Sequence, residues 1–259
     1  MKFSLFIVTI LLADMAEAHG GSEEPGKAHL LDILGGGLLA ISWLLYLAGT
    51  KRIPATFQQK WLFHGASLAA ILIIIASLHG WMDRSAAWHM AEHMWLMTLI
   101  VPLYLLSRPL PQWLAVSGRV GRKLFKSLFY LTRNPIQAAF IHAIAIWLWH
   151  MPGFYNSALI HPGWHFTGHA CLVFSASIFW WSVLSQRNST AFLALLLTVM
   201  HTGMLGALLT FSHTLLYLDA HDLQDQQLAG LIMWVPGGLP YLVASVWFSM
   251  NWLKRNASR

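Results

Sequence analysis

Long apolar runs separated by short polar stretches make up most of the 259-residue chain. The runs occupy positions 30–49, 61–79, 86–107, 135–151, 165–184, 191–212 and 226–250. A helix needs about 20 mainly apolar residues to cross the hydrocarbon core of a bilayer, and each run comes close to that length. The pattern therefore predicts an all-α fold, a polytopic membrane helix bundle with about seven transmembrane helices.

The N-terminal residues show a different pattern. Lys2 precedes the apolar run FSLFIVTILLA, and the small-residue sequence Ala-Glu-Ala follows it at positions 16–18. This order is typical of a secretory signal peptide, so we expect residues 1–18 to be cleaved and residues 19–259 to form a single transmembrane helical domain.

Cleavage would expose His19, whose imidazole and free α-amine would together form a chelate for Cu(II). An uncleaved short anchor is the alternative, because Asp14 lies at the end of the apolar run.

Composition and charge support the membrane prediction and orient the chain. Hydrophobic residues make up 57% of the sequence and charged residues 10%, and the mean hydropathy is +0.56. If the predicted helices alternate in direction, only Lys27 and Arg84 fall on one side of the membrane, and the other basic loop residues fall on the opposite side: Lys51, Arg52, Lys60, Arg108, Arg119, Arg122, Lys123, Lys126, Arg133, Arg187, Lys254, Arg255 and Arg259. Basic residues favour the cytoplasmic side, so we predict an N-terminus outside and a C-terminus inside. The net charge of +6 then reflects orientation, and no nucleic-acid partner is expected.

The longest predicted loop, 108–134, mixes basic and apolar residues. Interleaving of this kind is typical of a helix that lies on an anionic membrane surface. We therefore expect membrane lipid to be a partner of this loop.

Histidines gather at the predicted outer ends of the apolar segments. His89 and His93 are four residues apart and so share one face of a helix, and the spacing recurs in His165 and His169. Glu92, His150 and Asp225 lie at similar positions on the predicted segments. Ionisable groups inside membrane segments are costly and usually functional, so the two histidine pairs predict a metal site.

Sulfur-containing residues near these histidines favour copper as the metal. Met90, Met94 and Met97 follow a helical repeat beside His89 and His93, and the single cysteine, Cys171, follows His169 by two residues. Imidazole with thioether and thiol suits copper, particularly Cu(I), although zinc also accepts imidazole ligands.

Two further histidines, His142 and His201, lie deeper in the predicted membrane segments. They leave open a haem with axial imidazoles. The chain lacks G-x-S-x-G, P-loop, G-x-G-x-x-G and H-E-x-x-H motifs, so no enzymatic activity is expected.

Three segments carry a resemblance to a known family. They are HMAEHMWLMTLIVPLYLLSRPL, WHMPGFYNSALIHPGWHFTGHACLVFSASIFWW, and GALLTFSHTLLY followed by DQQLAGLIMWVPGG. Over roughly residues 60 to 250 the chain resembles the CtaG-type cytochrome c oxidase assembly factor family of bacterial multispanning membrane proteins. The resemblance implies a role in maturing haem–copper oxidases, at the copper-loading stage. The matching motif positions are His89, Met90, His93, Trp149, His150, Pro152, His169, Asp225, Gln226, Gln227, Ala229, Gly230, Met233 and Trp234.

The leading hypothesis is an assembly factor that binds copper at its periplasmic face. The expected ligands are His89, His93, His150 and His169, with Asp225, His165 or Met90 nearby. We expect it to receive the ion from a periplasmic copper carrier and to pass it to a haem–copper oxidase subunit.

Three alternatives remain at the level of sequence. A membrane copper transporter would use His142 and His201 as steps for the ion. A haem-binding membrane protein would use the same two residues as axial ligands. A metal-free chaperone would use the histidines at helix ends only as hydrogen-bonding groups.

Overall fold

The computed structural model describes residues 25–78, 85–186 and 188–257. The predicted signal peptide, residues 1–18, and His19 lie outside these ranges. All regular secondary structure within them is helical, which confirms the all-α prediction.

Each of the seven apolar segments contains a helix. In chain order the elements are α2 (Pro25–Thr50), α3 (Phe57–Leu78), α4 (Ala86–Met94), η2 (Trp95–Ile100), α5 (Val101–Leu106), α6 (Leu110–Leu131), α7 (Pro135–His150), α8 (Pro152–Ile160), α9 (Pro162–Gln186), α10 (Ser189–Thr210), α11 (Leu223–Trp234) and α12 (Leu239–Ala257). Two features differ from the prediction. The segment 226–250 is interrupted between α11 and α12, and the short helix α8 connects α7 to α9 where no helix was expected.

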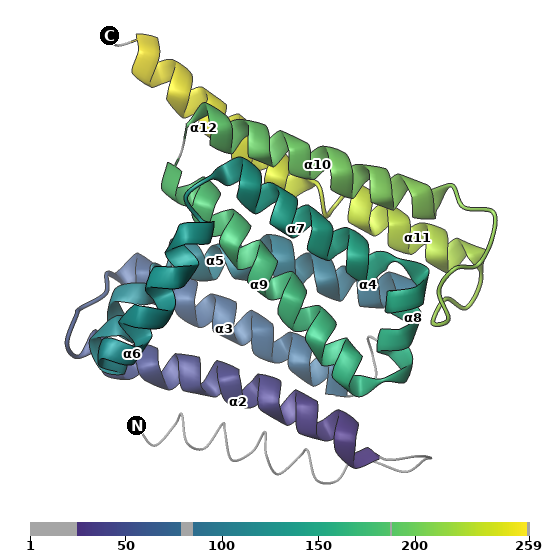
Figure 1. Ribbon diagram of the computed structural model, residues 1–259, viewed down its shortest axis with the longest axis horizontal. Coiled ribbons are helices and arrows are strands. Elements are labelled where there is room, and N and C mark those ends of the chain that lie inside the picture. Colours follow the sequence, from purple (N-terminus) through teal and green to yellow (C-terminus); the bar gives the residue numbers. More distant parts are fainter. Residues whose placement is uncertain (1–24, 79–84, 187, 258–259) are drawn as a thin grey trace.

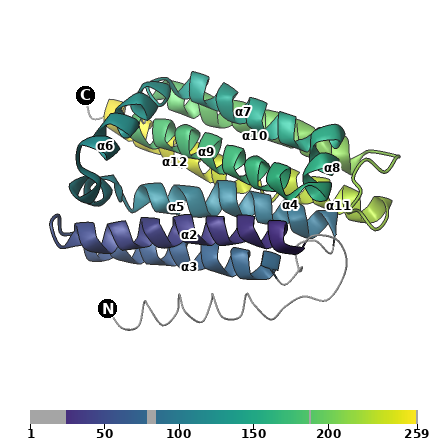
Figure 2. The same ribbon diagram turned by 60° about the horizontal axis from the view of Figure 1, so that its bottom comes forward.

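The helices run side by side in layers (Figures 1 and 2). The helices α2 and α3 lie along one side, α7 and α10 lie along the other, and α4, α5, α9 and α12 lie between them. The main apolar core fills this middle region with fully buried side chains such as Ile146, Phe179, Leu195 and Met233. The helix α6 closes one end of the bundle, and α8 with the start of α11 lies at the other end.

Several helices are long and apolar enough to cross a membrane. Four spans qualify by length and hydropathy, namely Phe57–Ala76, Pro162–Gln186, Ser189–Thr210 and Leu223–Met250. A fifth is the pair Ala86–Leu106 and Leu110–Arg119, which is bent by 77°. The chain is therefore a membrane protein, while the count of seven spans and the orientation of the termini stay predictions.

The helix predicted in the loop 108–134 is present as α6, and its place on the membrane surface stays a prediction. Its backbone turns at Gly118, where φ is +64°, a conformation that glycine adopts without the steric cost of a side chain. Because this turn follows the bend after α5, α6 lies across the end of the bundle (Figure 1).

Two glycines allow α10 and α11 to approach each other closely. A Cβ atom built on Gly206 would lie 2.7 Å from the Gly230 carbonyl oxygen, and one built on Gly230 would lie 2.6 Å from the Gly206 carbonyl oxygen. Backbone atoms cannot move aside as a flexible side chain can, so this contact depends on the missing side chains.

We expect Gly206→Val to lower the free energy of unfolding by about 1–3 kcal/mol, the usual cost of overpacking a tight contact. Thermal unfolding of the purified protein in detergent, followed by circular dichroism, measures the change. Gly35→Ala is the matched control, because a Cβ atom there has no neighbour within 4 Å. Equal unfolding temperatures for the two variants would contradict this account of the α10–α11 contact.

Candidate metal centre

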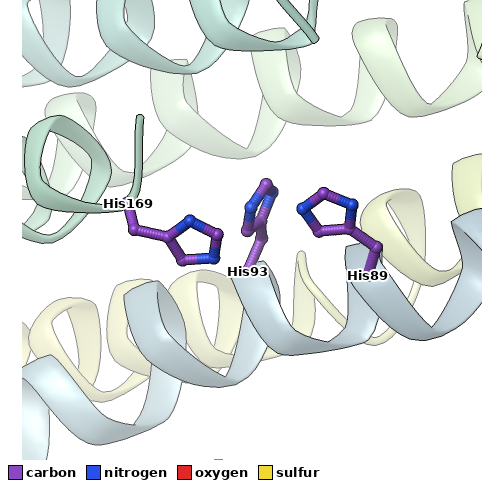
Figure 3. A group of neighbouring side chains, drawn as sticks. All are labelled: His89, His93 and His169. Carbon is purple, nitrogen blue, oxygen red and sulfur yellow. The ribbon is translucent and has the colours of Figure 1, made fainter. Parts of the chain in front are cut away.

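Three imidazoles from two helices converge in the interior of the bundle. His89 and His93 project from α4, and His169 reaches them from α9 (Figure 3). One ligand atom of each residue lies within 4.8 Å of those of the other two. Two nitrogens bound to one ion at about 2.0–2.1 Å lie at most about 4.2 Å apart, so side-chain shifts of under about 1 Å would close the site around a metal.

His150 and His165 extend this cluster. The ring of His150 lies 5.3 Å from that of His93, with His93 Nδ1 at 3.4 Å from His150 Nε2. The ring of His165 lies 4.3 Å from that of His169 and 5.5 Å from that of His89. We call these five residues, His89, His93, His150, His165 and His169, the histidine cluster.

Three of the histidine rings have an oxygen atom within hydrogen-bond distance of Nδ1. His150 Nδ1 lies 2.7 Å from the Ile146 carbonyl oxygen, and His169 Nδ1 lies 3.1 Å from the His165 carbonyl oxygen. His89 Nδ1 lies 3.2 Å from Asp219 Oδ2. Because each oxygen accepts a hydrogen bond from Nδ1–H, the Nε2 atom carries the lone pair, the form in which imidazole binds a metal.

The Glu92 carboxylate faces the ring of His169 in the histidine cluster, and this contact favours a proton or a cation between the two groups. Its Oε1 atom lies 3.5 Å from His169 Nε2, and the Glu92 side chain is only 6% exposed. With Nδ1 of His169 donating to a carbonyl, both facing atoms carry lone pairs. A proton or a metal cation between them removes the repulsion.

Asp219 and Tyr155 form the outer support of His89. The Tyr155 hydroxyl donates to Asp219 Oδ2 at 2.8 Å and lies 3.1 Å from His89 Nδ1. Burial, together with the Asp219 carboxylate, raises the pKa of Tyr155 well above its usual range, so the phenol keeps its proton. Among the described residues, Asp219 Oδ1 has no hydrogen-bond partner although it is buried. A carboxylate oxygen in that state is costly unless positive charge lies nearby, and a cation in the histidine cluster would supply it.

A loop between α10 and α11 delivers Asp219 to this position. Gln226, which is fully buried, accepts from the backbone N–H groups of Leu216 and Tyr217 and donates to the Thr214 carbonyl. Asn156 of α8 bonds the Leu216 carbonyl at 2.9 Å and the Leu218 N–H at 3.0 Å. These side chains replace the backbone hydrogen bonds that a loop lacks, and so they hold its shape.

Asp225 has a structural role at the start of α4. Its two carboxylate oxygens accept from the backbone N–H groups of Ala86 and Ala87, at 3.0 and 3.3 Å, and one also accepts from the N–H of His221. A carboxylate at a helix N-terminus satisfies donors that have no partner within the helix. Asp225 therefore ties α11 to the helix that carries His89 and His93, and Asp219 is the carboxylate that contacts an imidazole.

The methionines predicted beside the histidines lie in the apolar core. Met90 is fully buried, and Met94 and Met97 are at most 5% exposed. Cys171 is half-buried and packs against the same core. Imidazoles and carboxylates thus form the polar part of the site.

The comparison with known proteins bears on this site. The family model for the cytochrome c oxidase caa3 assembly factor (Caa3_CtaG) matches residues 44–255. The chain belongs to this family of cytochrome c oxidase assembly factors. No curated protein and no solved structure matches the chain.

Two local features of this assembly factor bring α7, α9 and α4 together around the cluster. A Cβ atom on Gly168 would lie 3.0 Å from the ring of Trp149, so the glycine next to His169 lets α9 pack against the residue next to His150. Directly after α4 the chain forms the π-helical segment η2, and the Trp180 indole N–H donates to the Met97 carbonyl within it at 2.9 Å. Such segments are rare and are frequent at functional sites.

The two deep histidines of the assembly factor differ from the cluster. His142 lies 3.0 Å from the Ser175 hydroxyl and 3.2 Å from the Tyr241 hydroxyl, so both ring nitrogens are engaged. A haem or an ion passing through this position would have to replace one of these hydrogen bonds. The nitrogens of His201 are buried and have no hydrogen-bond partner in the described part of the chain.

Sequence reasoning found all five histidines of the cluster and missed the contributions of Tyr155 and Asp219. Neither residue occurs at helical spacing from a histidine, and their contact with His89 depends on the fold of α8 and of the loop 211–222. The only sequence feature that pointed to them was the presence of a tyrosine and an aspartate in segments between histidine-containing helices.

We expect Tyr155→Phe to weaken the affinity of the purified protein for Cu(I) by about 10-fold or more, the usual effect of removing a residue that orients a metal ligand. The phenylalanine keeps the ring stacked on Tyr217 but loses the hydroxyl that meets Asp219 and His89. Competition with a chelator of known affinity measures the change. Tyr130→Phe, at an exposed position in α6, is the control, and equal affinities in the two variants would refute the role of the Tyr155 hydroxyl.

Proposed function

We propose that this assembly factor binds a copper ion in the histidine cluster and passes it to a subunit of cytochrome c oxidase. The observation that carries the proposal is the convergence of His89, His93 and His169 within the bundle. Family membership supports the acceptor, because a cytochrome c oxidase assembly factor must act on an oxidase. The ion is cargo in this proposal, bound and then released.

The donor set supports a transition metal as the cargo. Imidazole suits copper and zinc, whereas magnesium and calcium prefer oxygen ligands throughout. Within that pair, the family favours copper, since haem–copper oxidases require it. We propose His89, His93 and His169 as the first ligands, with His150 and His165 close enough to exchange with them during release.

The arrangement of the site fits delivery better than passage across the membrane. His142 precedes His150 on α7, and both of its ring nitrogens are bonded to hydroxyl groups. This supports a metal site that ends at the histidine cluster and does not continue to His142. We propose that the cluster faces the periplasm in the bacterial inner membrane, where a periplasmic copper carrier would supply the ion. The charge distribution of the loops supports this orientation.

Metal analysis of the detergent-purified protein after incubation with Cu(I) tests the site. We expect stoichiometric copper in the wild type and loss of most of it in the double variant His93→Ala/His169→Ala, because two of the three converging ligands are gone. His161→Ala/His213→Ala is the matched control, since both of these histidines are exposed and lie outside the cluster. Copper retained in the cluster variant at the level of the control would overturn the ligand assignment.

The same variants expressed in cells test delivery. We expect His93→Ala/His169→Ala to reduce the copper content and activity of cytochrome c oxidase to the level of a deletion strain, while the control variant keeps both. Haem content of the oxidase serves as the internal reference. A normal oxidase in cells carrying a variant that binds no copper would replace this proposal with a metal-free chaperone.

A further inference from the structure

A long apolar groove lies between the α2–α3 side of the bundle and α9, and it encloses about 950 Å³. Along α9 its wall runs from Pro162 to Trp181, about 28 Å at 1.5 Å per residue, close to the thickness of a bilayer's hydrocarbon core. One end reaches Glu92 and His169 of the metal centre. The other end is lined by α6, which contributes Phe125, Leu128 and Phe129.

The α6 end of the groove is positively charged. Arg122 and Lys126 are exposed, and each precedes a groove-lining phenylalanine by three residues, Phe125 and Phe129. Residues three apart on a helix are neighbours on its surface, so each cation lies beside the mouth of the groove.

The carboxylate side chains that the structure describes lie at the opposite end of the bundle from these cations. The sequence of α6 contains no Asp or Glu. Among the residues whose side chains the structure describes, four carry a carboxylate: Glu92, Asp219, Asp222 and Asp225. They belong to the metal centre or to the start of α11, and Figures 1 and 2 place the start of α11 at the end of the bundle away from α6.

The volume and the lining of the groove fit a lipid. Pockets of about 300–1,000 Å³ are typical for small ligands. Acyl chains are flexible and apolar, and they match both the volume and the lining.

We infer that the half of the groove next to α6 is a binding site for an anionic phospholipid. Its acyl chains lie among Phe125, Phe129 and Trp181, and its phosphate lies against Arg122 and Lys126. Trp113 also lines this end, and tryptophan is enriched at the level of the headgroups. The inference does not depend on copper binding or on delivery to an oxidase.

Native mass spectrometry of the full chain in detergent tests the charge requirement. With phosphatidylglycerol and phosphatidylcholine added in equal amounts, we expect one phosphatidylglycerol molecule to be retained in preference. Lys126→Gln should reduce its retention about fivefold, because one basic residue near an anionic surface contributes a factor of that size. Lys254→Gln, an exposed lysine in α12, is the matched control and should change nothing.

A second variant tests the groove. Ser177→Phe fills the space beside Trp181 without altering charge, and we expect it to reduce phosphatidylglycerol retention as strongly as Lys126→Gln; Ser177→Leu is the smaller replacement if the phenylalanine impairs folding. Equal retention of the two lipids would overturn the inference. It would also be overturned if only the Lys126 variant had an effect, because the lipid would then be adsorbed at the surface and not seated in the groove.

Discussion

The packing of this bundle depends on one constraint, the burial of several imidazoles away from water. Each ring removed from solvent needs a partner for its N–H group, and the bundle supplies oxygen atoms for this purpose. The carbonyl of Ile146 accepts from His150, that of His165 accepts from His169, and Asp219 accepts from His89. All three contacts use Nδ1, which leaves Nε2 as the atom that would bind a metal, and His150 Nε2 would then exchange its contact with His93 Nδ1 for the ion.

Helix packing around the cluster follows from this requirement. The rings come from α4, α7 and α9, so those three helices must meet at one depth. Gly168 lets α9 approach Trp149, and Asp225 fastens the start of α4 to α11. On the far side, Gly206 and Gly230 bring α10 against α11, which sets the position of the loop that carries Asp219.

The two ends of the bundle have opposite chemistry. One end holds the histidine cluster with Glu92 and Asp219, and the other holds the basic helix α6. The apolar groove joins them along α9. This cytochrome c oxidase assembly factor therefore has its clustered imidazoles and carboxylates at one end of the bundle and its basic, partly apolar helix at the other.

The sequence determined the helical class, the approximate helix positions and the identity of the five clustered histidines. Those features depend on local rules, since apolar length predicts a membrane helix and a spacing of four residues places two imidazoles on one helical face. The predictions for α3, α9 and α10 were close for this reason, as was that of a helix in the loop 108–134.

Contacts between residues distant in the chain were decided only by the tertiary structure. The sequence pattern placed Asp225 near the site; the structure shows its oxygens bonded to the backbone of α4, and it shows Asp219 in contact with His89. Met90 was expected near the site because it stands in the His-Met-x-x-His pattern of the family resemblance, and the structure shows its side chain buried in the apolar core. The helix α8 and the break before α12 were likewise invisible to hydropathy, because they change the direction of the chain without changing its apolar character.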